Sequence, residues 1–169
     1  MDIANELLID AFERIKDVVL ETIYGLDVDE LAFRPTEKAN SIAWLVWHLT
    51  RIQDDHISDL AGKEQVWAEV WHKKFGLPFG ESDTGYGHSS QDVAAVRPSA
   101  QQLAGYLDAV CSETVKYVKK LGAHDYQRVV DKRWDPPVTM AVRLISIISD
   151  DLQHAGQAAY IRGLLRKRS

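Results

Sequence analysis

The chain has 169 residues, of which 46% are hydrophobic and 27% are charged, a composition typical of a globular protein and not of a disordered or fibrous one. Its net charge of −5, without a long Lys/Arg cluster in the body of the chain, argues against nucleic acid as a partner. The one cysteine, Cys111, excludes an intramolecular disulfide and a Cys-rich zinc site, so any metal must be held by histidines and carboxylates.

The length fits a single domain over residues 1–169. The first residues are acidic where a signal peptide would be basic, and the apolar stretches are interrupted well before the roughly 18 residues of a membrane span. We therefore expect a cytoplasmic protein without membrane contact.

The first predicted helix runs from Asp2 to near Gly25, because apolar residues recur there at steps of three and four. Its expected inner face consists of Ile3, Leu7, Leu8, Ala11, Ile15, Val18, Val19 and Ile23.

Pro35 predicts a loop over residues 34–40, after which a second helix should begin at Ser41, a favourable N-cap, and end near Gly62. Its first turns, residues 42–49, are apolar on nearly every side. We expect this helix at the centre of the core.

Residues 61–98 show only weak periodicity, since glycines and Pro78 alternate with aromatic residues. A connection of this length is often a lid or a binding loop. We predict a long crossover with a short helix at about residues 67–74.

The third predicted helix starts at Ser99, with Gln102 as its capping-box partner, and ends at Gly122. Its expected buried face consists of Leu103, Leu107, Val110, Thr114, Val118 and Leu121. Cys111 lies on the same face, which indicates a buried and unreactive thiol.

Residues 129–137 should be extended and lead into a last helix from about Thr139 to Leu165. Its expected core residues are Leu144, Ile148, Leu152, Ala155 and Ala159, and its basic end carries Arg162, Arg166, Lys167 and Arg168. Four long helices with one long crossover between the second and the third predict an all-α four-helix bundle.

Polar residues within the most apolar helices are informative, because burying an unpaired ionisable group is costly. His48 lies in the second helix, and Asp150 and His154 lie four residues apart on one face of the last. If these helices pack together, two imidazoles and a carboxylate converge on a site suited to zinc, nickel or iron. The alternatives are a core histidine at position 48 and a simple surface pair of Asp150 with His154.

Two segments resemble a known superfamily. NSIAWLVWHLTR (residues 40–51), followed by Asp54 and Asp55, resembles the second helix of the DinB-like metal-binding four-helix bundles, and DDLQHAGQ (residues 150–157) resembles their closing motif. FGL (75–77), GYGHS (85–89) and WDPPV (134–138) resemble the branch of mycothiol-dependent S-transferases.

The resemblance implies that His48, Asp150 and His154 bind the metal, with Asp151 as the second choice for the carboxylate. Many members of the superfamily have a histidine at the position of Asp150, whereas mycothiol-linked members, including the maleylpyruvate isomerases, tend to carry a carboxylate. Zinc is the expected metal, with nickel and iron as alternatives.

The implied activity is detoxification, in which a metal-bound thiolate of mycothiol, the low-molecular-weight thiol, is transferred to a small electrophile. A mycothiol-dependent isomerase and a non-catalytic metal-binding stress protein are the alternatives. A homodimer is compatible with the family.

Arg51 and Tyr86 are the candidate catalytic residues, although Arg51 could instead pair with Asp54 or Asp151. The candidate substrate-binding residues are Trp44, His88, Trp134 and Gln157. For the tryptophans the alternative is core or lid packing, for Tyr86 and His88 a turn over the bundle mouth, and for Gln157 the orientation of a ligand. We expect His56, His72 and His124 at the surface.

Overall fold

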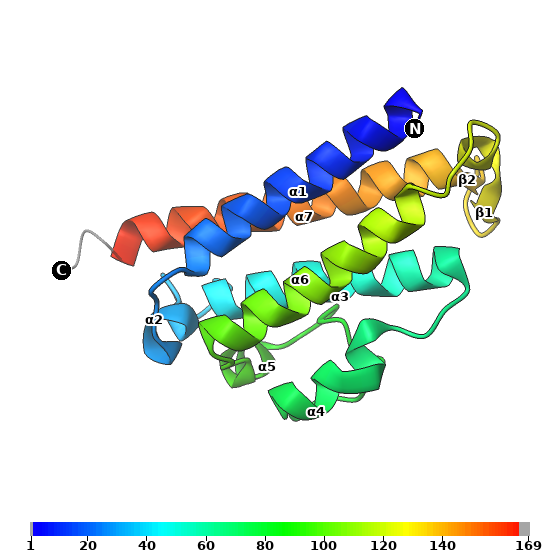
Figure 1. Ribbon diagram of the computed structural model, residues 1–169. Helices are drawn as coiled ribbons and strands as arrows, with labels where there is room; N and C mark the ends of the chain where they lie inside the picture. The colour runs from blue at the N-terminus through cyan, green and yellow to red at the C-terminus, as the bar shows by residue number, and fades with distance from the viewer. Residues whose placement is uncertain (1, 166–169) are drawn as a thin grey trace.

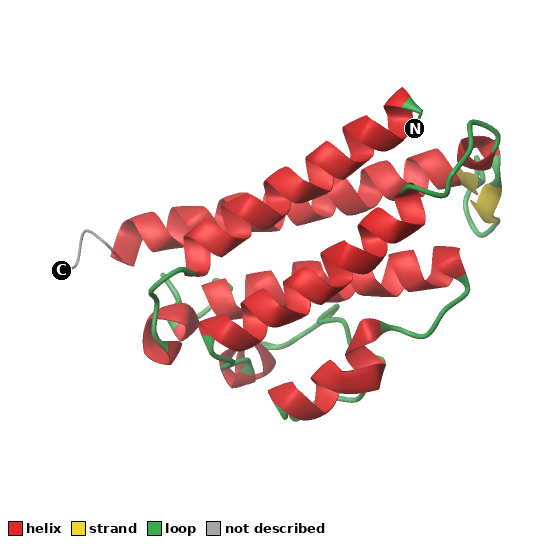
Figure 2. Cartoon of the chain, in the orientation of Figure 1, coloured by secondary structure: helices red, strands yellow, loops and turns green. Residues whose placement is uncertain are grey.

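A computed structural model describes residues 2–165 of the chain. The helices are α1 (Ile3–Ile23), α2 (Val28–Ala32), α3 (Ile42–Ala61), α4 (His72–Phe75), α5 (Ser90–Ala95), α6 (Ala100–Val118) and α7 (Met140–Leu165), with a π-helical turn η1 (Trp67–Trp71) and a 3₁₀ turn η2 (Asp125–Gln127). The strands are β1 (Val129–Asp131) and β2 (Val138–Thr139). Helices dominate the chain (Figure 2), which confirms the predicted all-α class.

Four long helices form the bundle, and each packs mainly against two neighbours. α7 contacts both α1 and α3, and α6 contacts the same two helices from the other side. In Figure 1 the crossover after α3 carries the chain back along the bundle, so that α3 and α6 run in the same direction. This is the predicted four-helix bundle with one long crossover.

The predicted helix starts are confirmed by their caps. Ser41 Oγ accepts a hydrogen bond from the backbone N–H of Trp44 at 3.1 Å, and Ser99 and Gln102 form a complete capping box at the start of α6. Such a cap typically stabilises a helix by about 1 kcal/mol. Gly62 ends α3 in the left-handed conformation that favours glycine, with φ of 63°.

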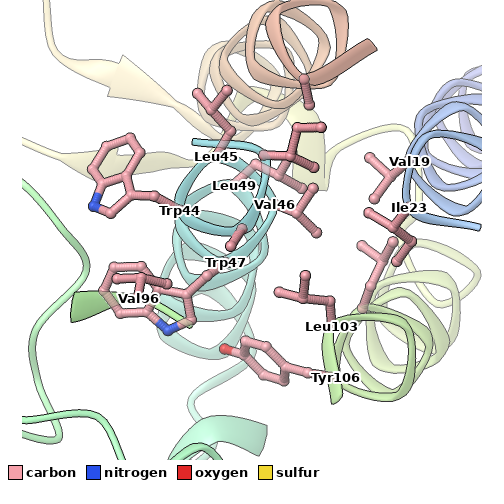
Figure 3. Packing of buried hydrophobic residues seen from close by; sticks show 14 of the residues in the cluster. Val19, Ile23, Trp44, Leu45, Val46, Trp47, Leu49, Val96, Leu103 and Tyr106 are labelled. Atoms are coloured by element: carbon pink, nitrogen blue, oxygen red, sulfur yellow. The ribbon is translucent and has the colours of Figure 1, made fainter. Parts of the chain in front are cut away.

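The main core lies among α1, α3 and α6, and each large aliphatic side chain that it buries contributes roughly 1.5–3 kcal/mol. Figure 3 shows Val19 and Ile23 from α1, Leu45, Val46 and Leu49 from α3, and Leu103 and Tyr106 from α6. α3 is buried almost all round over its first turns, as its sequence predicts.

The inner faces of the two outer helices differ from the prediction. In α1, Ile3 and Leu7 are exposed and Phe12 is buried instead. In α7, Leu152 is exposed while Asp151 points inward. Consecutive residues of a helix point about 100° apart, so a small rotation of the helix buries one residue and exposes the residue next to it.

The crossover is held to α3 by a buried carboxylate. The side chain of Asp54 accepts hydrogen bonds from the backbone N–H groups of Val66 and Trp67, at 3.1 and 2.8 Å, and from Tyr106 Oη at 2.8 Å. The helical segment predicted at residues 67–74 is present as η1 and α4, and α5 is a further short helix that the sequence did not indicate.

β1 and β2 form an antiparallel hairpin before α7, where the sequence predicted an extended connection. The carboxylate of Asp131 pairs with Arg133 at 2.8 Å and with Arg143 of α7 at 3.0 Å, which fixes the hairpin to that helix. Within residues 2–165, no helix combines the length and apolar character needed to cross a bilayer. The predicted basic residues 166–168 lie outside the described range.

Candidate metal centre

His48 reaches the site from the middle of the most buried helix. Its side chain lies in the apolar run of α3 and the residue is 3% exposed. Because α3 packs directly against α7, the imidazole faces the polar residues of that helix rather than solvent. The buried position lowers the pKa of His48, with desolvation as the largest cause, and so favours the neutral imidazole that binds metals.

α7 supplies the other two candidate ligands. Asp150 and His154 stand one turn apart, with His154 Nε2 3.7 Å from Asp150 Oδ1, and the rings of His154 and His48 have centroids 5.0 Å apart. One ligand atom each from His48, Asp150 and His154 lies within 4.8 Å of the others. The structure thus brings together the three residues predicted as metal ligands.

An unsatisfied oxygen tests whether this group suits a cation. Asp150 Oδ2 is buried and has no hydrogen-bond partner among the described residues. A buried carboxylate oxygen without a partner is costly, and a divalent cation between the two imidazoles would satisfy it. Two neutral nitrogens and one carboxylate form a donor set that zinc, nickel and iron accept. The residues therefore fit the metal that the sequence implied.

Hydrogen bonds on the far side of both imidazoles determine which nitrogen is free. His48 Nδ1 donates to the backbone carbonyl of Thr84 at 2.5 Å, and His154 Nδ1 donates to Gln157 Oε1 at 2.9 Å. Each bond leaves Nε2 as the lone-pair nitrogen, the arrangement found around bound metals. Gln157 accordingly contacts a candidate ligand, which matches the alternative that it orients one.

Two aromatic residues border the group. Trp44 stacks on His48, and its ring meets that of His154 edge to face at a centroid distance of 6.4 Å. Tyr86 stands edge to face on His48 at 5.5 Å but is 72% exposed. Burial first, and then the charge of Asp150, raise the pKa of Tyr86, so its phenol is protonated at neutral pH. The site is therefore walled by Trp44 and bordered toward solvent by Tyr86.

A shallow, open groove runs along the outside of α7 and is lined by residues of that helix alone. It has a volume of about 560 Å³ and reaches Asp150. Its lining is Ala141, Val142, Ile145, Ser146, Ser149, Asp150 and Gln153. Asp150 is the candidate ligand that borders this groove, whereas His48 and His154 are not among its lining residues.

His88, predicted to contact substrate, has no ring nitrogen left for a ligand. Its Nδ1 accepts from Trp44 Nε1 at 3.0 Å and its Nε2 donates to Asp83 Oδ1 at 3.1 Å. The ring is also stacked on Trp47, with centroids 5.6 Å apart. In this arrangement His88 supports the wall of the site, and its predicted contact with substrate stays a prediction.

Arg51, predicted as catalytic, is fully buried and directed into the crossover. Its Nε donates to the carbonyl of Asp83 at 3.1 Å. A second nitrogen donates to Gln65 Oε1 and Tyr106 Oη, at 2.8 and 3.2 Å, and lies 3.8 Å from Asp54. These partners, and the carbonyl of Glu81, belong to the crossover, α6 or α3 itself. These contacts engage the charge of Arg51 in anchoring the crossover and include the predicted alternative pairing with Asp54, while a catalytic role for Arg51 stays a prediction.

Trp134 and Asp151 lie outside the group as well. Trp134 is 66% exposed beside the hairpin, and none of the ring contacts described for the site includes it. Asp151 points into the bundle core, where burial raises its carboxyl pKa well above the ordinary value. The geometry therefore favours Asp150 over Asp151 as the carboxylate ligand.

The remaining histidines and the cysteine are mostly as expected. His124 is exposed, whereas His56 and His72 are half-buried, contrary to the prediction. Cys111 is buried, as predicted, and desolvation raises the pKa of its thiol to about 12, which disfavours the nucleophilic thiolate.

Sequence reasoning missed the backbone carbonyl of Thr84 and the role of Gly85 beside it. Every residue has a backbone carbonyl, so the residue type at position 84 does not indicate that its carbonyl accepts a hydrogen bond from His48. The glycines at 85 and 87 were the available signal, since both adopt positive φ angles of 98° and 75°.

Comparison with known proteins identifies a matching family and a similar solved structure. The sequence pattern of the family described as Mycothiol-S-transferase matches residues 7–167. A crystal structure of a conserved protein from Enterococcus faecalis is similar, with a TM-score of 0.89, 32% sequence identity and 96% of each chain covered. No curated protein matches the chain. With a match over nearly its whole length, and with the bundle and the His-Asp-His group described above, the chain belongs to the Mycothiol-S-transferase family.

Proposed function

We propose that the protein is a metal-dependent mycothiol S-transferase that joins mycothiol to a small electrophile, such as a halogenated compound or an epoxide. The observation that carries the proposal is the convergence of His48, Asp150 and His154 beside an open groove. The family match supports the thiol and the type of reaction.

The three side chains would hold the metal with one position left for substrate. His48 and His154 offer Nε2 atoms whose partners on Nδ1 fix them in place, and Asp150 offers the charge that a divalent cation needs. We propose zinc, which takes such donor sets in catalytic sites, with nickel and iron as the alternatives.

When bound, a divalent cation would lower the pKa of an incoming thiol, so that its sulfur can attack as a thiolate at neutral pH. The protein's contribution is orientation, since buried α3 and α7 keep the three ligands on one side and leave the other side to the reactants. The new S–C bond forms as the carbon–halogen bond breaks and the halide leaves, or as an epoxide C–O bond breaks and its oxygen takes up a proton from solvent. The thiol proton passes to solvent at the open side.

Tyr86 is the residue best placed to assist the electrophile. Its phenol is protonated, it borders the site at His48, and it is exposed to the solvent from which substrates arrive. We propose that Tyr86 donates a hydrogen bond to the departing halide or to the epoxide oxygen, where negative charge develops.

The groove along α7 favours catalysis over purely structural metal binding. A structural centre is enclosed by its ligands, whereas here Asp150 belongs both to the ligand group and to the lining of the groove. Val142 and Ile145 give this groove an apolar wall that suits a small organic electrophile.

Calorimetric titration of zinc-loaded protein with thiols tests the proposal. We expect mycothiol to bind at least about 10-fold more tightly than glutathione or cysteine, because a metal alone does not discriminate between thiols and the surroundings must do so. Equal binding of all three would contradict the mycothiol assignment. An isomerase would return mycothiol unchanged, so loss of free thiol during turnover separates transferase from isomerase.

A further inference from the structure

A three-residue turn of the crossover lies against the candidate ligand His48. This 83–85 turn (Asp83, Thr84 and Gly85) presents the carbonyl of Thr84 to His48 Nδ1. A Cβ atom added to Gly85 would lie 2.9 Å from that nitrogen and 3.0 Å from the rings of Trp44 and Trp47. With its φ of 98° as well, position 85 admits only glycine without displacing the turn or the imidazole.

Side-chain hydrogen bonds keep this turn in place. Asp83 Oδ1 accepts from the backbone N–H of Gly85 at 2.8 Å and from His88 Nε2 at 3.1 Å. The aspartate closes the turn on itself and ties it to the ring of His88, which packs against both Trp47 and Phe79.

α3 holds the turn from both sides of His48, directly through Arg51 and indirectly through His88, which is bonded to Asp83. Trp44, four residues before His48, donates from Nε1 to His88, and Arg51, three residues after it, donates from Nε to the carbonyl of Asp83. Residues three and four apart lie on one face of a helix, so the two attachments straddle the imidazole. The indole of Trp44 and the buried guanidinium of Arg51 thus hold the crossover next to the turn that faces His48.

We propose that the 83–85 turn is a positioning element for the metal centre, in which the Thr84 carbonyl fixes the Nδ1–H tautomer and the direction of His48. The inference rests on the proposed function, since it gives the turn a purpose for metal binding. Asp83 and His88 are positioning residues that act through this carbonyl. The crossover is then a built part of the centre, in addition to any role as a lid.

Two glycine variants isolate the effect. Gly85→Ala introduces the contact with His48, whereas Gly87→Ala imposes a similar backbone cost at φ of 75° with nothing within 4 Å of the added Cβ atom. We expect Gly85→Ala to weaken Zn²⁺ binding by about 10- to 100-fold in competition with a chromophoric chelator, and Gly87→Ala to stay within about threefold. Equal affinities in the two variants would overturn the proposal.

Nitrogen-15 NMR of the histidine rings supplies a readout that does not depend on metal. In wild-type protein treated with EDTA, we expect His48 to show a protonated Nδ1 and an unprotonated Nε2. In Gly85→Ala this tautomer should be lost or mixed, while His124 is unchanged. An unaltered His48 signal in a folded Gly85→Ala protein would contradict the assigned role of the Thr84 carbonyl.

A second pair of variants applies if Gly85→Ala does not fold. Asp83→Ala removes the acceptor for Gly85 and His88, whereas Asp83→Asn keeps an oxygen at the same place. We expect Asp83→Ala to weaken Zn²⁺ binding by about 10-fold and Asp83→Asn to restore most of it. Wild-type affinity in Asp83→Ala would overturn the inference.

The two hypotheses fail in different ways. If wild-type protein binds no Zn²⁺ but His48 loses its Nδ1–H tautomer in Gly85→Ala, the metal centre is wrong and the effect of the turn on His48 stands. If Zn²⁺ binds to wild type and to Gly85→Ala alike, the metal centre stands and the positioning role is wrong.

Discussion

The indole ring of Trp44 lies nearly parallel to the imidazole of His48, with ring centroids 4.6 Å apart and an angle of 14° between the planes. The two residues are one turn apart on α3, and the same indole donates a hydrogen bond to His88. Trp44 therefore joins the candidate metal ligand to the crossover, and its fluorescence should respond to events at His48.

Trp44→Phe should abolish most of the fluorescence change that zinc produces. Binding at His48 alters the charge next to the stacked indole, whereas none of the other described tryptophans has a ring contact with His48 or His154. Titration of EDTA-treated protein with Zn²⁺ gives the measurement. Trp71→Phe is the matched control, since Trp71 packs on Phe75 and Tyr106 in the crossover and α6. A signal that survives in Trp44→Phe and disappears in Trp71→Phe would place the zinc elsewhere.

His48→Ala should remove most of the bound metal while the helical content persists. The bundle is held by apolar contacts of α3, such as those of Leu45 and Leu49, which the substitution leaves in place. Metal analysis and circular dichroism give the two readouts. His56→Ala, a half-buried histidine farther along the same helix, should keep its metal. A stoichiometric metal content in His48→Ala would show that the proposed ligand set is wrong.

Asp150→Asn should lower zinc affinity by about 10-fold or more, because it keeps the shape of the ligand and removes its charge. Asp151→Asn should leave the affinity within about threefold, since its side chain is buried in the core, away from the ligand group. Chelator competition measures both. The reverse order of effects would move the carboxylate ligand by one residue.

The choice between Asp150 and Asp151 as the carboxylate ligand shows what the sequence could and could not predict. Apolar periodicity and capping residues such as Ser41 and Ser99 predicted the four long helices, since these signals are local. The rotation of α7 is decided by tertiary packing, so the sequence alone left Asp150 and Asp151 as competing ligands.

The roles of Arg51 and His88 could not be derived for a related reason. A polar residue in or near an apolar helix can serve a ligand or a neighbouring segment, and only the path of the crossover decides which. Here the crossover places the backbone carbonyl of Asp83 next to Arg51 and the carboxylate of Asp83 next to His88. The proximity of His48, Asp150 and His154 was predictable, because they lie on long helices whose contact in the bundle could be expected.

Asp131→Asn should destabilise the protein in a pH-dependent way. Hydrogen bonds from Arg133, and then the charges of Arg133 and Arg143, hold the carboxyl pKa of Asp131 well below that of the unfolded chain. Since the folded pKa is the lower one, the ionised carboxylate stabilises the fold above about pH 4, and this contribution is lost as the pH falls from there toward the folded pKa.

Thermal unfolding from pH 7 down to the most acidic pH at which the wild type is folded checks this sign. The melting temperature of Asp131→Asn should lie below that of the wild type at pH 7, and the gap should narrow below about pH 4. Asp135 is an exposed aspartate of the same connection, so Asp135→Asn should have the melting temperature of the wild type at every pH. A gap that widens on acidification would contradict the assignment.

The rate of mycothiol loss in the presence of the fluorogenic electrophile chlorobimane tests the central claim most directly. Protein treated with EDTA is assayed before and after one equivalent of Zn²⁺, with Cys111→Ser measured alongside. A free thiol is only about 3% ionised at pH 7, so we predict that zinc raises the rate at least about 10-fold and that Cys111→Ser, which loses only a buried thiol, matches the wild type. A rate that is independent of zinc, or one that disappears in Cys111→Ser, would contradict metal-dependent thiol transfer at His48, Asp150 and His154.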